Sequence, residues 1–111
     1  MNLREIQRRC HNIAIDKGFW DKKPSTSKKK SVLRKNRNDA EMICLMHSEL
    51  SEALEEIRNE KINWDNVEEE LADCVIRICD YCGGRGLDLE MGIMKKIKKN
   101  KERPYKHGRK F

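Results

Sequence analysis

Two stretches of the chain decide its fold class. Residues 39–59 read DAEMICLMHSELSEALEEIRN, and residues 66–82 read NVEEELADCVIRICDYC. In both stretches apolar side chains recur at intervals of three and four residues, which is the spacing of one face of an α-helix. The two apolar stripes consist of Ile43, Met46, Leu50, Ala53, Leu54 and Ile57 in the first stretch and of Val67, Leu71, Cys74, Val75, Ile78 and Cys82 in the second. We predict two helices that pack through these stripes.

Two further helices are predicted near the ends of the chain. Asn2 suits the N-cap of a helix over residues 3–17, and Asp88 suits the N-cap of a helix that follows it. In the last helix we expect Leu89, Ile93 and Ile97 to be buried. No segment alternates apolar and polar side chains in the way a half-buried strand does.

These elements predict a single all-α domain over residues 1–111, of the four-helix-bundle type. Glycines at positions 83, 84 and 86 are expected to end the helix that precedes them. Residues 21–38, rich in lysine and serine, are predicted to be a basic mobile loop, and residues 101–111 are predicted to be a basic, irregular tail.

The composition leaves little apolar material for a core. Hydrophobic residues make up 37% of the 111 residues and charged residues 40%, so association with a second copy is expected to bury further apolar surface. No apolar run is long enough to span a membrane, and the charged N-terminus lacks the apolar segment of a signal peptide. With five cysteines, an odd number typical of reduced thiols, we expect a cytoplasmic protein.

Charge is strongly segregated along the chain. Residues 22–37 carry eight Lys or Arg and no acid, and residues 95–111 carry nine Lys or Arg and one acid. Between them, residues 39–73 carry twelve Asp or Glu against two basic residues, a balance of −10. Such segregation raises self-repulsion unless a ligand uses it. A metal ion in the acidic part and a polyanion near the basic parts would do so.

Four acidic residues repeat one local pattern on the two central helices. At about 100° per residue, Glu49 and Glu52 lie on one flank of the first stripe, and Glu70 and Asp73 lie on the matching flank of the second. If the stripes pack together, the four carboxylates converge at the edge of the core. Their mutual repulsion favours a hard cation with oxygen ligands, such as Mg²⁺, Mn²⁺ or Ca²⁺. One such motif alone usually marks a solvated helix face, but two copies in matching phase are more specific.

At these residues the chain resembles the MazG-like, all-α nucleoside triphosphate pyrophosphohydrolases. The signature of that family is Glu-Glu-x-x-Glu followed by Glu-x-x-Asp, and residues 48–52 and 70–73 read SELSE and ELAD here. Residues 17–21, KGFWD, and residues 100–108, NKERPYKHG, are also similar to the family. The resemblance covers nearly the whole chain and is weakest over residues 21–37. One departure is Ser48, which stands where the family has its leading Glu and leaves the number of metal ions open.

The resemblance implies an activity and a ligand set. It implies hydrolysis of a nucleoside triphosphate, ribo- or deoxyribo-, to the monophosphate and pyrophosphate, with Mg²⁺ as cofactor and Mn²⁺ as a possible substitute. The implied metal ligands and catalytic residues are Glu49, Glu52, Glu70 and Asp73, and one of them or Glu56 would orient the attacking water. It also implies a homodimer or homotetramer in which one pocket takes residues from two chains.

Residues outside the acidic motifs are candidates for substrate binding. Lys98, Asn100, Lys101 and Arg103 are expected to face the phosphates, since Arg offers a bidentate fork to them. Trp20 and Tyr105 are expected to stack on the base. The alternatives are a solvated basic tail for the first group and simple packing for the aromatic pair.

A second hypothesis treats the chain as a non-enzymatic nucleic-acid-binding or regulatory helical protein. The basic segments 22–37 and 95–111 would contact backbone phosphates. Segment 22–37 suits equally a lid that closes over a nucleotide, and the sequence does not decide between the two. This hypothesis leaves the paired acidic motifs unexplained.

Overall fold

The computed structural model describes residues 1–21 and 37–111, and all regular structure in those residues is helical. The helices are α1 (Leu3–Asp16), α2 (Asp39–Ile57), α3 (Trp64–Arg85) and α4 (Leu89–Glu102), followed by a short 3₁₀ helix, η2 (Tyr105–Gly108). The predicted all-α class is therefore confirmed. The mobile loop predicted for residues 21–38 falls for the most part on residues 22–36, outside the described residues.

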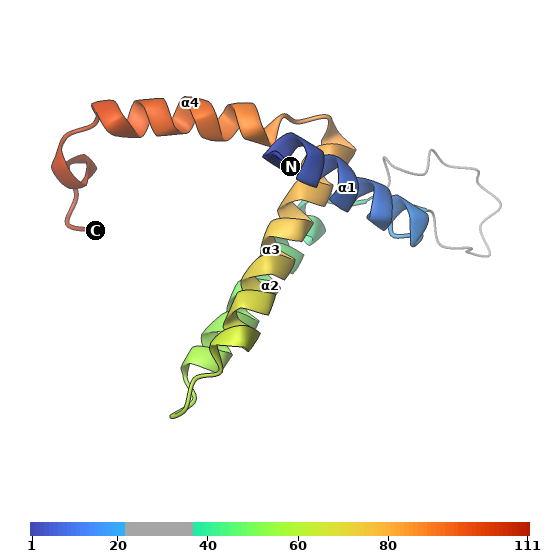
Figure 1. Ribbon diagram of the computed structural model, residues 1–111, viewed down its shortest axis with the longest axis horizontal. Helices are drawn as coiled ribbons and strands as arrows, with labels where there is room; N and C mark the ends of the chain where they lie inside the picture. Colours follow the sequence, from blue (N-terminus) through green and yellow to red (C-terminus); the bar gives the residue numbers. More distant parts are fainter. Residues whose placement is uncertain (22–36) are drawn as a thin grey trace.

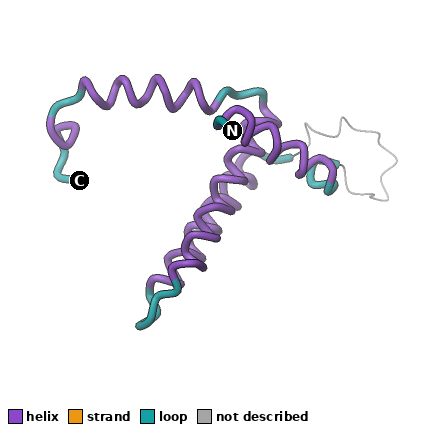
Figure 2. The backbone as a smooth tube through the Cα atoms, in the orientation of Figure 1, coloured by secondary structure: helices purple, strands orange, loops and turns teal. Residues whose placement is uncertain are grey.

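The packed part of the molecule consists of three helices. Helices α2 and α3 form a long hairpin, and α1 lies across the C-terminal end of α3 (Figure 1). Helix α4 contacts α1 and then runs out to one side, as the tube in Figure 2 also shows. The radius of gyration is 17.4 Å, against about 13 Å for a compact domain of this length. The bundle is therefore open, and in one chain α4 does not complete it.

The predicted N-caps are confirmed. The side chain of Asn2 accepts a hydrogen bond from the backbone N–H of Glu5, and that of Asp88 accepts one from the N–H of Met91. Asn63 caps α3 in the same way, and the helix starts at Trp64, two residues before the predicted start at Asn66. These side chains satisfy backbone donors that have no partner within the helix.

The predicted end of α3 is wrong by one turn. The helix continues through Gly83 and Gly84 to Arg85 and ends at Gly86, whose φ of 67° is the left-handed conformation of a glycine C-cap. The two earlier glycines serve close packing instead. A Cβ on Gly83 would lie 2.6 Å from the Cβ of His11, and one on Gly84 would lie 2.1 Å from the Trp20 ring.

We expect Gly84→Ala to destabilise the fold. The added methyl group would overlap the Trp20 ring, and overpacking of this kind costs about 1–3 kcal/mol of unfolding free energy. The higher helix propensity of alanine returns at most about 1 kcal/mol. Urea denaturation would measure the difference.

Gly92 provides a matched control on α4. A Cβ there meets no atom within 4 Å, so Gly92→Ala should be neutral or stabilising by up to about 1 kcal/mol. Equal stability of the two variants would contradict the packing role of Gly84.

The buried face of α2 is rotated from the predicted stripe. The side chains that α2 buries are those of Met42, Met46, Glu49 and Ala53. The predicted stripe residues Ile43, Leu50, Leu54 and Ile57 are 40–56% exposed, and on α3 Leu71 and Val75 are exposed as well. The other stripe residues Met46 and Ala53 on α2 and Val67, Cys74 and Cys82 on α3 are buried as predicted. One hairpin has a single inner face, and the leucine side of each stripe turns away from it. An apolar surface of the hairpin is thus left uncovered in one chain.

Two other predictions of burial have different outcomes. In the described chain Ile93 and Ile97 on α4 are exposed and Leu89 is half-buried, so the predicted burial of α4 is wrong for a single chain. All five cysteines are free thiols, as predicted: Cys74, Cys79 and Cys82 are buried, Cys10 is half-buried and Cys44 is exposed. Burial raises the pKa of the Cys79 thiol to about 11, so it is neutral at physiological pH. Within residues 1–21 and 37–111, no helix combines the length and the apolar character needed to cross a membrane.

Candidate metal centre

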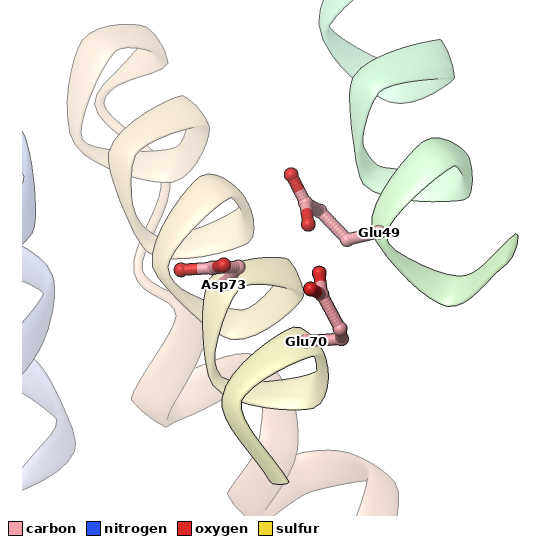
Figure 3. Close-up of side chains that lie close together, drawn as sticks. All are labelled: Glu49, Glu70 and Asp73. Carbon is pink, nitrogen blue, oxygen red and sulfur yellow. The ribbon is translucent and has the colours of Figure 1, made fainter. Parts of the chain in front are cut away.

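Three of the four predicted carboxylates meet between α2 and α3. One oxygen each from Glu49, Glu70 and Asp73 lies within 4.8 Å of the other two. Figure 3 shows Glu49 reaching from α2 toward Glu70 and Asp73 on α3. We call these three residues the acidic triad. Glu52 lies outside the triad, but its carboxyl group adjoins Glu70 and is the largest cause of the raised pKa of that residue.

Glu49 is inside the helix interface and not at its edge. Only 7% of the residue is exposed, and it occupies the buried line of α2. Its Oε1 accepts a hydrogen bond of 3.0 Å from Nε of Arg77 on α3. We predicted Glu49 on the flank of the core because the leucine stripe of α2 was expected to be the buried face. The rotation of α2 brings the carboxylate inward.

Glu70 is held in an arrangement that disfavours its charge. Its Oε2 atom is buried and has no hydrogen-bond partner within the described residues. The adjoining carboxyls of Glu52 and Glu49 raise the pKa of Glu70 to about 7. The protonated form of Glu70 is favoured because it can donate a hydrogen bond to these carboxylates and avoids their negative charge. A proton or a cation at Glu70 would relieve this arrangement.

The donor set fits a hard divalent cation. All atoms that converge are carboxylate oxygens, which Mg²⁺, Mn²⁺ and Ca²⁺ prefer, and no His or Cys joins the group among the described residues. Three or four protein oxygens leave coordination positions for water or phosphate, which is the usual environment of Mg²⁺. Glu49, Glu70 and Asp73 would hold the ion, with Glu52 beside Glu70 as a fourth ligand.

We expect the stability of the metal-free protein to fall as pH rises toward about 7. The folded-state pKa of Glu70 is raised above its usual value of 4.5 to about 7. A raised pKa stabilises the fold fully below about 4.5 and loses that effect as pH passes through about 7. Urea denaturation in a chelator at about pH 5 and about pH 8 would measure the loss.

Two variants test the assignment to Glu70. In Glu70→Gln this part of the pH dependence should disappear, whereas the exposed neighbour Glu69, changed to Gln, should leave it intact. The lowered pKa values of Asp39, beside Arg85, and of Asp88, at the start of α4, affect stability only in more acidic solution. An unchanged pH profile in Glu70→Gln would refute the assignment.

A cavity of about 300 Å³ adjoins the acidic triad between α1 and α3. Its walls are apolar toward α1 and charged toward α3 and Arg37. They are formed by Cys10, Ile13, Ala14, Phe19, Arg37, Glu49, Asp73, Ile76, Arg77 and Asp80. A cavity of this size next to a cation site suits a small organic phosphate.

Asp80 is a buried acid that sequence reasoning missed. Its Oδ1 accepts a hydrogen bond of 2.7 Å from Nε1 of Trp20 and lies 2.9 Å from Nδ1 of His11. Nη1 of Arg37 lies 3.4 Å from its Oδ2. Asp80 therefore joins α3 to His11 on α1, to Trp20 and to Arg37. On a helical wheel Asp80 lies opposite the stripe residues Ile78 and Cys82, so the sequence gives no indication of its partners on other segments.

Trp20 lies in the core. None of its surface is exposed, and the guanidinium groups of Arg37 and Arg85 lie 5.2 and 5.6 Å from the centroid of its ring. His11 meets the ring edge-on. This environment favours packing, the alternative raised from the sequence, over stacking on a base. The predicted stacking role would require these side chains to move.

The remaining predicted residues lie apart from the acidic triad in one chain. Glu56 accepts hydrogen bonds from the backbone N–H of Asn63 and from the side chain of Asn66, so it braces the turn of the hairpin. An open hollow near that turn is lined by both Glu56 and Glu70. The predicted phosphate and base contacts lie at the end of α4 and beyond it, and all five side chains are exposed: Lys98, Asn100, Lys101, Arg103 and Tyr105. Because α4 runs away from the hairpin (Figure 1), these residues do not reach the triad of their own chain.

Comparison with known proteins gives no match: neither a family model, nor a curated protein, nor a solved structure is similar to this chain.

Proposed function

We propose that the protein is a Mg²⁺-dependent nucleoside triphosphate pyrophosphohydrolase of the MazG-like type. The observation that carries this proposal is the acidic triad, which brings two distant acidic motifs together around a buried, unpartnered oxygen of Glu70. Those are the motifs in which the sequence resembles the family. The cavity beside the triad supports the proposal because it offers room for a nucleotide next to the cation site.

The protein groups divide the work of such a reaction. Glu49, Glu70 and Asp73 would hold the cation, and Glu52, whose carboxyl adjoins Glu70, would complete its negative environment. Bound Mg²⁺ supplies charge that polarises the phosphate oxygens of the substrate. A carboxylate oxygen not used in ligation orients a water molecule in line with the bond between the α-phosphorus and the leaving pyrophosphate. The apolar wall of the cavity on α1 excludes other water from the reacting group.

We also propose that a second copy covers the apolar surface of the hairpin. Leu50 and Leu54 on α2 and Leu71 and Val75 on α3 are large side chains that a soluble monomer rarely leaves exposed together. A homodimer or homotetramer would cover them and would allow α4 of one chain to approach the site of another. Light scattering at micromolar concentration tests this, and a monomeric mass would rule it out.

The function is tested by incubating the protein with a panel of ribo- and deoxyribonucleoside triphosphates and Mg²⁺. Release of pyrophosphate and monophosphate in equal amounts is expected for at least one nucleotide. The same reaction in a chelator is the control and should show none. Absence of turnover with every nucleotide would rule out the enzyme, and release of inorganic phosphate instead would place the cleaved bond elsewhere.

The exposed helix α4 favours one second candidate, nucleic-acid binding. The side chains of Lys95, Lys98 and Lys101 lie at intervals of three residues on α4. In the part of the chain that the structure describes, none of them forms a salt bridge with an acidic residue of α2 or α3. Contacts of this kind neutralise backbone phosphates, so binding should weaken steeply with salt. Binding to a short duplex that persists in Glu49→Gln and is lost when these three lysines are changed to Gln would support it.

A further inference from the structure

Arg77 is the basic side chain that contacts the acidic triad. It follows Asp73 by one turn of α3, so both side chains lie on the same face of the helix. Its Nε donates to Oε1 of Glu49 at 3.0 Å. The Arg77 side chain is 38% exposed while that of Glu49 is 10% exposed, so the guanidinium group bridges the buried carboxylate and the solvent.

Most of the hydrogen-bonding capacity of Arg77 is unused. A guanidinium group has five N–H donors, and in residues 1–21 and 37–111 only Nε of Arg77 has a hydrogen-bond partner. The group lines the cavity of about 300 Å³, together with Glu49 and Asp73. Donors of its Nη atoms are therefore available beside the triad.

The ion pair between Arg77 and Glu49 is expected to stabilise the site less once a divalent cation is bound than before. In the metal-free protein Arg77 neutralises a carboxylate that is almost fully buried, which is otherwise costly. A divalent cation among the triad would take over that task. Two positive groups would then compete for Glu49, and their repulsion would weaken the pair and free the guanidinium group.

A freed guanidinium group beside a cation is suited to one class of ligand. Phosphate oxygens in the coordination shell of the cation would lie next to Glu49. They would be within reach of Arg77, whose Nε is 3.0 Å from Oε1 of Glu49. The planar fork of arginine binds two phosphate oxygens at once. Among the described residues the other guanidinium group of this cavity, that of Arg37, pairs with Asp80, and the lysines of α4 lie away from the triad.

We propose that Arg77 is a phosphate-binding residue of this site, paired with Glu49 in the free protein and with a phosphate of the nucleotide in the complex. This inference rests on the function proposed above. It assigns to α3 a role that we predicted for Lys98, Lys101 and Arg103. It also predicts opposite effects on the two ligands, since Arg77 opposes the cation and favours the nucleotide.

Isothermal titration of three proteins tests the proposal. Wild type, Arg77→Gln and Arg77→Lys are titrated with Mg²⁺ alone, and then, in Mg²⁺, with a nucleoside triphosphate whose α,β-bridging oxygen is replaced by methylene. In Arg77→Gln the affinity for Mg²⁺ should stay equal or rise several-fold, and that for the analogue should fall roughly 10- to 100-fold. Arg77→Lys should lose less, because it keeps the charge and lacks the fork.

The controls separate this role from simple support of the fold. Arg58→Gln removes an exposed arginine that pairs with Glu55 at the end of α2 and should change neither affinity. Loss of both affinities together in Arg77→Gln, or an unchanged affinity for the analogue, would overturn the proposal. If Arg77→Gln does not fold, Arg77→Lys decides: full affinity for the analogue then overturns it. If the wild type binds neither Mg²⁺ nor the analogue, that result refutes the proposed function itself.

Discussion

Changing Glu49 to Gln or Asp73 to Asn is expected to lower pyrophosphate release by a factor of about 100 to 1,000. Each substitution keeps the shape of the side chain and removes one negative charge from the acidic triad. The remaining carboxylates would hold Mg²⁺ more weakly and place its charge less accurately at the phosphate. Steady-state assays at several Mg²⁺ concentrations would separate loss of metal affinity from loss of turnover.

The fold should tolerate these changes, which makes the test clean. Asp73 lies among like charges, so its neutralisation relieves repulsion. Glutamine at position 49 keeps an oxygen that can accept the hydrogen bond from Nε of Arg77, whose side chain is 38% exposed and stays hydrated. Glu68→Gln supplies the matched control, because Glu68 is an exposed acid on α3, two residues before Glu70. Full activity in both triad variants would show that the triad is not the catalytic site. An equal loss of activity in Glu68→Gln would show that the effect comes from the net charge of the protein and not from the triad.

The local part of the fold could be predicted from the sequence. Helix existence follows from apolar periodicity and from caps such as Asn2 and Asp88, which act on their own backbone and need no tertiary context. The end of α3 could not be predicted, because Gly84 looks like a helix breaker until Trp20 is found against it. Contacts between distant segments decide such cases.

The buried face of α2 shows a different limit. A helical wheel assumes that the most apolar arc of a helix is buried within its own chain. Here Leu50 and Leu54 are exposed and Glu49 is buried. The wheel therefore predicted correctly which carboxylates lie near one another, but it predicted the burial of Glu49 wrongly. A wheel cannot distinguish an arc that faces the core from one that faces a second copy.

The acidic motifs could be found in the sequence, but their supporting residues could not. Glu49, Glu70 and Asp73 repeat in matching phase, and that pattern predicted their convergence. Arg77 and Asp80 have no such repeat, and each looks like an ordinary charged residue of an amphipathic helix until its partner on another helix is known. Long-range pairing of single side chains has no periodic signal.

Replacing Trp20 with Ala is expected to be the most destabilising single change among those considered. The side chain is fully buried, and truncation of such a residue costs about 3–5 kcal/mol of unfolding free energy. The change also removes the 2.7 Å hydrogen bond from Nε1 to Asp80 and leaves that buried carboxylate with fewer donors. Small domains are stable by only about 5–15 kcal/mol, so the variant should melt at a markedly lower temperature.

Trp64 offers the comparison that makes this result specific. It begins α3 with 64% of its surface exposed, so Trp64→Ala should change stability by no more than about 0.5 kcal/mol. Thermal melts followed by circular dichroism would compare the two variants directly. If Trp20 were instead held open for a nucleobase, its replacement would lower nucleotide affinity and leave the melting temperature near that of Trp64→Ala. That result would contradict the structural role, which follows from the contacts of the ring with Gly84, His11 and Asp80.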